Sequence, residues 1–255
     1  MQFKDCVAVV TGGASGLGEA CVRDLVSYGS RVAIFDIKDD QGNALADDFG
    51  ASVIFVHTDV TSEESVKAAI GSVKDNFGVV NVAINCAGIG FAEKVWSKRG
   101  SMQIDNFNTV VGLNLVGSLN IIIRCVEQMV NNTPNEEGER GVIINTASIA
   151  AFDGQVGQAA YSASKAGVVG MTLPIARECA AYGIRVVTIA PGIFETPMMA
   201  MLPKEACDKL AESIPFPKRL GRPSEFAMLC RQVIENPMLN GETIRLDGAL
   251  RMQEK

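Results

Sequence analysis

The stretch VVTGGASGLGEA, residues 9–20, joins the end of an apolar run to a turn with several glycines. Glycine adopts backbone conformations that other residues avoid and lets a ligand approach the chain closely. A helix that begins after such a turn presents free N–H groups and a positive end to a phosphate. The stretch therefore predicts a strand, a turn and a helix, with Gly12, Gly16 and Gly18 as candidate contacts of a dinucleotide. A tight turn without a ligand is the alternative for this stretch alone.

Short apolar runs alternate with longer helical patterns along the rest of the chain. Continuous apolar runs are typical of parallel strands that are buried on both faces. We expect seven strands, at residues 6–13, 31–36, 52–60, 80–88, 141–148, 184–192 and 242–248. We expect helices at residues 16–29, 39–49, 62–77, 104–132, 157–182 and 223–235. This order predicts an α/β fold, with a doubly wound parallel sheet of about seven strands and helices on both faces.

The composition is that of a soluble globular protein, and its 255 residues contain no linker-like segment or repeat, so we expect one domain over residues 1–255. A net charge of −6 gives no general attraction to nucleic acid or anionic lipid. No membrane contact is expected either, because no apolar run reaches the roughly 20 residues of a membrane span. A strand follows the first residues directly and leaves no room for a signal peptide. We therefore expect a cytoplasmic protein, with the mitochondrial matrix as the alternative in a eukaryote.

Cysteine and histidine usage restricts the possible chemistry. The seven cysteines are scattered and form no C-x-x-C motif, which favours reduced thiols over a disulfide framework. His57 is the only histidine and lies in an expected strand. Metal sites built on several histidines and a Ser-His-Asp triad are therefore not expected, and we predict no metal.

Several strand ends carry residues suited to a dinucleotide. Asp36 ends the second strand, where a carboxylate can bind both ribose hydroxyls and repel a 2′-phosphate, which favours NAD over NADP. Ser15 stands in the turn where a cation could pair with such a phosphate, and Lys38 is the one nearby cation that could offset Asp36. Further candidates end the third and fourth strands, with ordinary strand-end roles as the alternative: Asp59, Val60, Cys86, Ala87 and Gly88.

A second group of residues could perform acid–base chemistry. The fifth expected strand brings Ser148 to the same sheet edge, and Tyr161 and Lys165 follow on one face of a helix. A free tyrosine has a pKa near 10, and a nearby ammonium lowers this pKa. The pair would then be a usable acid–base couple, with Ser148 holding the substrate oxygen. A surface Tyr and Lys on an amphipathic helix are the alternative for the pair alone.

These motifs together resemble the short-chain dehydrogenase/reductase family: T-G-x-x-x-G-x-G at 11–18, N-x-A-G at 85–88, Ser148, Y-x-x-x-K at 161–165 and P-G at 191–192. The resemblance covers essentially the whole chain and implies a Rossmann-type sheet and hydride transfer with a nicotinamide cofactor. It implies that Tyr161 is the acid/base, that Lys165 also binds the nicotinamide ribose, and that Ser148 orients the substrate. Asn114 matches the family asparagine that holds a water in the proton relay, although Gly112 stands where the family often has an acid.

Four longer stretches, at residues 141–167, 171–179, 188–197 and 236–253, resemble the branch of type-2 3-hydroxyacyl-CoA dehydrogenases, also called type-10 17β-hydroxysteroid dehydrogenases. This resemblance implies NAD as cofactor, short or branched 3-hydroxyacyl-CoA esters as substrates, and a homotetramer. The cofactor contacts that it implies are Ser15, Leu17, Asp36, Asp59, Val60, Cys86, Tyr161, Lys165, Phe194 and Thr196, the last two after the turn at Pro191.

Other assignments stay open. Gln155 is a candidate for the acyl pocket, or simply a polar residue at a helix entry. Lys98 and Arg99 could contact CoA phosphates or only solvent. The rival functions are a steroid or secondary-alcohol dehydrogenase, a 3-oxoacyl-[acyl-carrier-protein] reductase, and a non-catalytic dinucleotide-binding scaffold.

Overall fold

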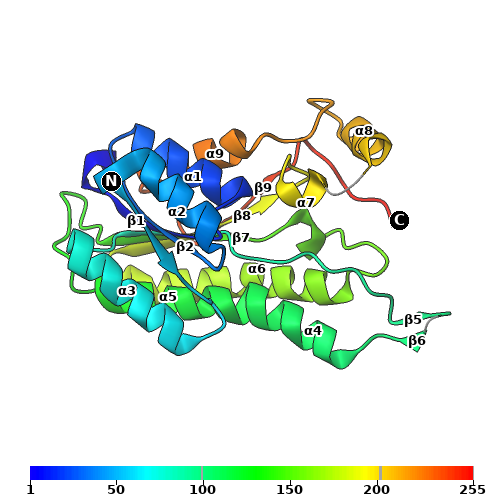
Figure 1. The fold of residues 1–255 in the computed structure, drawn as a ribbon, viewed down its shortest axis with the longest axis horizontal. Coiled ribbons are helices and arrows are strands. Elements are labelled where there is room, and N and C mark those ends of the chain that lie inside the picture. Colours follow the sequence, from blue (N-terminus) through cyan, green and yellow to red (C-terminus); the bar gives the residue numbers. More distant parts are fainter. Residues whose placement is uncertain (99, 201–202, 255) are drawn as a thin grey trace.

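The computed structural model describes residues 1–98, 100–200 and 203–254, so Arg99 lies outside the described part. A seven-stranded parallel sheet lies between two layers of helices (Figure 1). The sheet order is β3-β2-β1-β4-β7-β8-β9, which confirms the predicted doubly wound α/β fold. Its strands are β1 (Val7–Thr11), β2 (Arg31–Asp36), β3 (Val53–His57), β4 (Val82–Asn85), β7 (Gly141–Thr146), β8 (Ile184–Pro191) and β9 (Thr243–Leu246).

The long helices follow the predicted alternation. Those on one face of the sheet are α1 (Gly16–Ser27), α2 (Asp39–Phe49) and α9 (Pro223–Glu235), and those on the other are α3 (Glu63–Phe77), α4 (Ile104–Val111), α5 (Gly117–Met129) and α6 (Ala159–Ala180) (Figure 1). The predicted capping residue Ser62 accepts a hydrogen bond from the backbone N–H of Ser65 at the start of α3.

Both faces of the sheet are buried, and successive residues of a strand serve different cores. Along β1, Ala8 and Val10 pack with α1 and α9, whereas Val7 and Val9 pack with α3 and α5. Every residue of β1 and β8 is buried, which explains why these strands are continuous apolar runs in the sequence.

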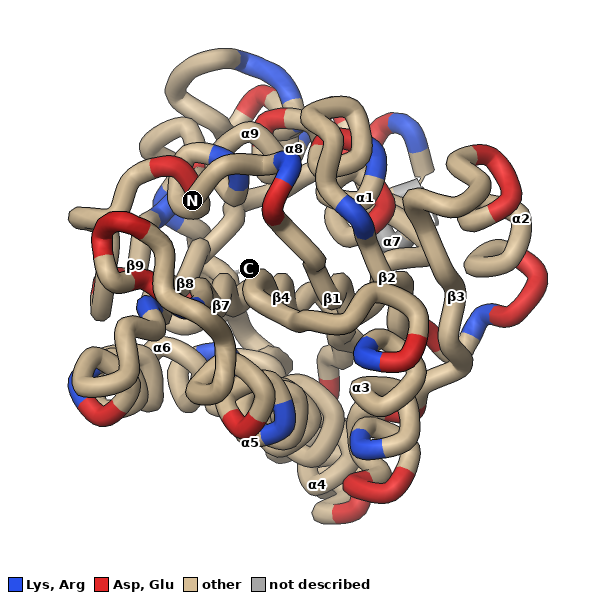
Figure 2. Tube along the Cα trace, turned by 90° about the vertical axis from the view of Figure 1, so that its left-hand side faces the viewer, with Lys and Arg blue, Asp and Glu red and all other residues tan. Residues whose placement is uncertain are grey.

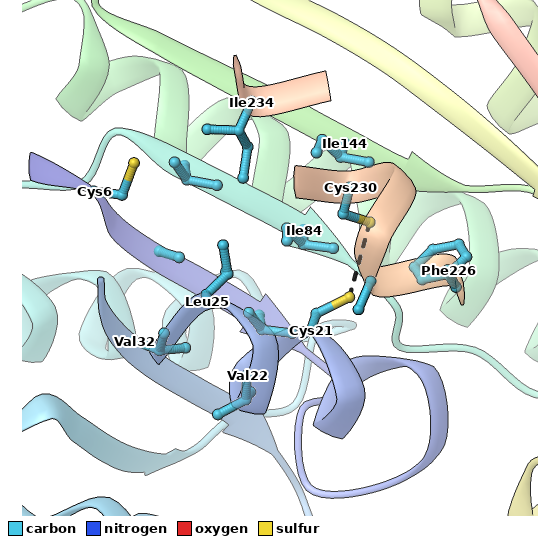
Figure 3. Packing of buried hydrophobic residues seen from close by; sticks show 14 of the residues in the cluster. Cys6, Cys21, Val22, Leu25, Val32, Ile84, Ile144, Phe226, Cys230 and Ile234 are labelled. Carbon is cyan, nitrogen blue, oxygen red and sulfur yellow. Dashed lines mark hydrogen bonds between the residues drawn. The ribbon is translucent and has the colours of Figure 1, made fainter. Parts of the chain in front are cut away.

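The first of these cores contains a pair of thiols (Figure 3). The sulfur atoms of Cys21 in α1 and Cys230 in α9 lie 3.8 Å apart among aliphatic side chains. Burial raises the pKa of the Cys230 thiol. All seven cysteines are free thiols in the structure, as the sequence predicted, and Cys86 and Cys207 are the two that are only partly buried.

The predicted helix at 104–132 is confirmed over Ile104–Met129, but one of its turns is not α-helical. The structure divides it into α4, a π-helical segment η3 (Gly112–Val116) and α5. The side-chain amide of Asn114, at the centre of η3, bonds the backbone of Ile89 in both directions, with Nδ2 3.0 Å from the carbonyl oxygen and Oδ1 2.9 Å from the N–H. The wider π turn directs this amide toward the loop after β4, and such turns are frequent at functional sites.

The sequence pattern did not reveal three small elements. A two-stranded hairpin, β5 (Trp96–Ser97) and β6 (Gly100–Ser101), projects beyond the end of α4 (Figure 1). Two helices, α7 (Pro197–Ala200) and α8 (Lys204–Ser213), follow β8. None of the described residues of α8 is buried. The helix is held by two partly buried residues, Leu210 and Ala211, which pack against side chains from distant segments.

One described stretch, Ile104–Met129, is long and apolar enough to cross a membrane by length and composition alone. This is weak evidence for a membrane span, because its buried residues pack against the sheet in the helix layer with α3 and α6. Acidic and basic residues are interspersed around the outside of the molecule in Figure 2.

The fold leaves no room for a side chain at Gly18. A Cβ at this position would collide with the carbonyl oxygen of Gly12, whereas a Cβ at Gly71, in α3, meets no atom within 4 Å. We expect Gly18→Ala to reduce the free energy of unfolding by about 2–3 kcal/mol, because backbone must move to admit the methyl group. The matched control Gly71→Ala should raise it by up to ~1 kcal/mol. Urea denaturation measures both; equal effects would contradict the close approach at Gly18.

Candidate active site

The predicted residues meet at the edge formed by the carboxyl ends of the strands. The glycine turn follows β1, Asp36 ends β2, the segment from Cys86 to Gly88 follows β4, and Ser148 follows β7. The order of the strands reverses between β1 and β4, and ligands bind in the crevice at such a point.

The glycine turn is a close-fitting cradle. Gly12 and Gly16 have φ angles of 62° and 59°, in the left-handed region that favours glycine. A Cβ on Gly12 would lie 2.9 Å from the backbone nitrogen of Ala87, so the turn packs tightly against the loop after β4. The first turn of α1 has free N–H groups, and Ser15 at its N-cap makes no side-chain capping bond. These features fit a dinucleotide pyrophosphate.

Asp36 is fixed by the backbone around it. Its carboxylate accepts hydrogen bonds from the N–H groups of Ala14 at 3.1 Å, Ile37 at 2.8 Å and Lys38 at 3.2 Å, and only 8% of the residue is exposed. The Lys38 ammonium lies 3.4 Å from the Ser15 hydroxyl in the glycine turn. The cation that could oppose the selectivity of Asp36 therefore reaches the glycine turn, where the sequence showed no other cation.

The end of β3 is more exposed. Asp59 accepts hydrogen bonds from the hydroxyl and the N–H of Thr61, and these bonds hold its pKa below the ordinary value. Val60 is buried, packs against Gly117 and offers its carbonyl oxygen to the Asn120 amide. Both residues follow β3, whose last residue, His57, pairs with Asp36 in the sheet.

The segment after β4 is fixed by Thr11. Its hydroxyl accepts hydrogen bonds from the N–H groups of Cys86 and Ala87, each at 3.1 Å. A Cβ on Gly88 would lie 3.2 Å from Oδ1 of Asn114 and 3.4 Å from Nζ of Lys165. The absence of a side chain at Gly88 therefore lets the loop lie against two candidate catalytic groups.

Ser148 lies near Tyr161, where its hydroxyl lowers the pKa of the phenol and so opposes the effect of burial. The Ser148 hydroxyl also accepts a hydrogen bond from the N–H of Ala150, which fixes its rotamer at the start of a short 3₁₀ turn, η4 (Ile149–Ala151). Lys165 lies one turn further along α6, and its ammonium donates to the carbonyl oxygen of Thr146 at 2.8 Å. The Lys165 nitrogen is 5.9 Å from the centre of the Tyr161 ring. The geometry joins a phenol, a hydroxyl and an amine at one point.

Asn114 completes this cluster. It is fully buried, and besides its two bonds to Ile89 its amide donates to the Ser164 hydroxyl at 3.1 Å. Ser164 in turn donates to the carbonyl oxygen of Tyr161 at 2.7 Å. The π-helical segment is thus tied to the helix that carries the phenol and the amine. Gly112, where the resemblance would often place an acid, leaves these bonds in place.

A model of the family described as short chain dehydrogenase matches residues 6–206. The chain belongs to the short-chain dehydrogenase family. Two relatives named 3-hydroxyacyl-CoA dehydrogenase type-2 are each 53% identical to it: one from Drosophila melanogaster, over 98% of this chain and 99% of the relative, and one from Homo sapiens, over 99% and 97%. The crystal structure of a 3-hydroxyacyl-CoA dehydrogenase type-2 from Mycobacterium avium, at 44% identity, superposes with a TM-score of 0.96 and covers 100% of this chain and 99% of that one.

The electrostatics of this short-chain dehydrogenase differ from the sequence expectation. Burial raises the pKa of Tyr161 above 10, and the nearby Ser148 hydroxyl opposes this rise only in part. Burial also lowers the pKa of Lys165 from 10.5 to about 8. The expected lowering of the tyrosine pKa is therefore absent from the protein alone, because burial disfavours the charged form of the phenol.

The segment after β8 places the remaining cofactor candidates of this short-chain dehydrogenase. Pro191 ends β8 and is buried, and Phe194 bridges to Gly221 and packs edge-on against Phe226. Thr196 lies above the glycine turn, with its Cβ 3.7 Å from where a Cβ of Gly16 would be. Leu17 is partly buried against the first core. All four therefore line the same crevice as the glycine turn or support it.

Gln155 lies between Ser148 and Tyr161 in the chain, but its side chain points to the C-terminal segment. Its amide nitrogen donates to the carbonyl oxygen of Gln253 at 3.0 Å, and its own N–H donates to Gln158. No hydrogen bond joins Gln155 to the Tyr161 side chain among the described residues, so its place in the acyl pocket stays a prediction. Among the residues that the structure describes, no group of three or more His, Cys, Asp or Glu side chains could hold a metal ion.

Three supporting residues escaped the sequence analysis. Thr11 and Thr146 fix the loop after β4 and the Lys165 ammonium, and Ser164 links Asn114 to α6. Thr11 lies inside the glycine motif and could have been identified as a strand-end hydroxyl. The role of Thr146 depends on a backbone carbonyl, which no sequence pattern reveals.

The buried Lys165 should influence stability in a defined pH range. The folded protein releases this proton near pH 8, whereas the unfolded chain holds it until about pH 10.5, so the stability that this residue contributes rises with pH in between. We expect the unfolding free energy of the wild type, minus that of Lys165→Met, to increase by on the order of 1 kcal/mol from pH 7 to pH 9. Urea denaturation at both pH values measures it. Lys67→Met, at an exposed position of α3, controls for the loss of one charge; a falling difference would contradict the burial of the ammonium.

Proposed function

We propose that this short-chain dehydrogenase interconverts short or branched 3-hydroxyacyl-CoA and 3-oxoacyl-CoA esters, with NAD as hydride carrier. The observation that carries the proposal is the meeting of Tyr161 and the buried Lys165 ammonium, 5.9 Å from the phenol ring and close to Ser148, at the sheet edge that also holds the dinucleotide cradle. The acyl-CoA substrate class rests on relatives that are 53% identical over nearly their full length and are named 3-hydroxyacyl-CoA dehydrogenase type-2.

The dinucleotide would be held by residues of the first half of the chain. The N–H groups at the start of α1 would face the pyrophosphate, and Asp36 would accept hydrogen bonds from the hydroxyls of the adenosine ribose. Because three N–H groups hold the Asp36 carboxylate at the end of β2, this carboxylate would repel a 2′-phosphate, and this supports NAD over NADP. When bound, the nicotinamide accepts a hydride from the carbinol carbon or returns it to the carbonyl carbon.

The protein groups move the proton. In the direction of reduction, the raised pKa keeps Tyr161 protonated, and its hydroxyl donates a proton to the substrate oxygen. Ser148 holds that oxygen next to the phenol. In the direction of oxidation Tyr161 removes the hydroxyl proton, and a charged Lys165 stabilises the phenolate. The hydrogen bonds of Asn114 to the loop after β4 and to Ser164 hold these groups in place.

We also propose that the protein forms a homotetramer. The outer side of α4, η3, α5 and α6 exposes large apolar residues, with between 37% and 68% of each accessible: Ile104, Val116, Leu119, Ile123 and Leu173. On a monomer such a surface would be exposed to water, whereas a second copy of the chain could bury it. Residues 1–255 are proposed to form one domain, since β9 near the end of the chain pairs with β8 in the sheet that β1 begins. A cytoplasmic location, or a mitochondrial one in a eukaryote, stays a prediction.

A turnover panel tests the substrate class. Acetoacetyl-CoA, its 2-methyl analogue, a keto steroid and an acyl-carrier-protein 3-oxoacyl ester are each assayed with NADH and with NADPH. We expect the two CoA esters with NADH to give the highest kcat/KM, by at least about tenfold over the same esters with NADPH. A preference for the steroid, or for the carrier-protein ester with NADPH, would contradict the proposal in favour of those rival functions. Binding of dinucleotide without turnover of any substrate would favour a scaffold.

Tyr161→Phe tests the proton donor. Removal of the hydroxyl leaves the ring and the cradle intact, so we expect the affinity for NADH to stay within about twofold while kcat falls by roughly 10²–10⁴-fold. Dinucleotide binding is followed by NADH fluorescence and turnover by absorbance. Tyr182→Phe, at a half-exposed position after α6, is the matched control and should behave as the wild type. Near-normal turnover of Tyr161→Phe would refute the assignment.

A further inference from the structure

Arg245, in the edge strand β9, is the centre of a partly buried charge cluster. Its guanidinium lies 2.6 Å from the carboxylate of Asp153 and 2.7 Å from that of Asp247. It also donates to the carbonyl oxygen of Leu250 at 3.0 Å and lies over the Phe152 ring at 5.2 Å. Its side chain is 21% exposed and that of Asp153 is 19% exposed, so the pair is largely shielded from water. One cation thus joins three segments of the chain.

Two of these segments are the loop of residues 149–158, between Ser148 and Tyr161, and the C-terminal tail, residues 248–254. Asp153 lies in the loop, and Leu250 lies in the tail. Further along, the N–H of Val156 donates to the carbonyl oxygen of Glu254 at 2.9 Å, and the Gln155 amide donates to that of Gln253 at 3.0 Å. The tail therefore runs beside the loop and bonds it at two points beyond the charge cluster.

The apolar side chains of the tail reach the residue next to Ser148. Leu250 and Met252 pack in a small cluster with Ile149, Ile193 and Ile214, separate from the two main cores. The cluster also includes Leu210 of α8. Figure 1 shows the tail ending near α8, on the side of the molecule where this loop lies. The tail thus contacts both Ile149, at the start of the loop, and Ile193 and Ile214, which follow β8.

We propose that Arg245 is a positioning residue for the reaction: by its ion pair with Asp153 it fastens the C-terminal tail to the loop of residues 149–158 and so sets the substrate side of the active site. The proposal deepens the proposed function and rests on its assignment of Ser148 and Tyr161. The low pKa of Asp153 beside Arg245 agrees with a paired carboxylate.

The expected effect follows from where the loop begins and ends. Ser148 precedes it and Tyr161 follows it, while the dinucleotide cradle belongs to α1 and β2, far along the chain. A loosened loop would weaken the binding of the acyl substrate in the ground state and the transition state alike without changing the cradle, so KM should rise more than kcat falls. Loss of the pair should therefore act on the acyl substrate and leave the dinucleotide unaffected.

The test compares Arg245→Met, Arg245→Lys and Asp153→Asn with a matched control, Arg251→Met. Arg251 also contacts Asp247 and lies in the same tail, but it is 61% exposed. We expect Arg245→Met to raise KM for acetoacetyl-CoA by about tenfold, with a smaller change in kcat, and to leave the Kd of NADH within twofold. Arg245→Lys keeps the charge without the planar fork and should recover part of the loss. Arg251→Met should change each quantity by less than twofold.

Two more measurements separate positioning from a general loss of structure. Hydrogen exchange should accelerate in residues 149–158 of Arg245→Met and stay unchanged in β8. In a double-mutant cycle, Asp153→Asn should add little to Arg245→Met, because both remove the same pair. The proposal would be overturned if Arg245→Met raised KM, lowered kcat and weakened NADH binding by equal factors. It would also be overturned if the effects of Arg245→Met and Asp153→Asn were additive, or if hydrogen exchange in the loop did not change.

Failure of the proposed function would be recognisable separately. If the wild type prefers a steroid or a carrier-protein ester, the acyl-CoA assignment fails, and the same variants are compared on the preferred substrate. A rise in KM on that substrate, with NADH binding preserved, would still support the role of Arg245; an unchanged KM would overturn it.

Discussion

A lysine ammonium enclosed by the protein needs a hydrogen-bond acceptor, and in this fold the carbonyl oxygen of Thr146 supplies it at 2.8 Å. This bond joins α6 to the end of β7 and so fixes the rotation of the helix that carries Tyr161. It also demands small neighbours, since a side chain at Gly88 would crowd both the ammonium and Asn114. The π-helical segment, the glycine after β4 and the strand-end threonines can all be understood as the surroundings that one buried cation requires.

The sequence predicted the sheet and most of the helices because their signals are local. Continuous apolar runs mark strands covered on both faces, and the positions of Asp36 and Ser148 at strand ends follow from that alternation alone. The features that escaped prediction depend on contacts between distant segments. The π turn around Asn114 exists because of a loop 25 residues away, and α8 is positioned by the tail and by Ile149.

The acid–base pair shows the same limit. Spacing on a helix correctly placed Tyr161 and Lys165 on one face, and ordinary electrostatics then suggested a lowered tyrosine pKa. Burial reverses that direction, because it disfavours the charged form of both groups. Spacing shows which groups meet but not how much water they retain, and solvation decides the protonation states. The same holds for Arg245: its sequence context suggests an ordinary edge-strand residue, and only the returning tail gives it partners.

The strand order 3-2-1-4-7-8-9 has a broader consequence. The cradle and Asp36 come from the chain before β4, and the proton-transfer groups, α8 and the tail come after it. At the crevice the two halves meet through Thr11 and the residues after β4, and elsewhere through the packing of α1 against α9. Substitutions in the second half can therefore change the carbonyl compounds that are accepted, while Asp36 and the cradle, which are proposed to hold the adenosine and pyrophosphate parts of the coenzyme, stay unchanged. Such a partition helps one architecture to diversify into many catalysts.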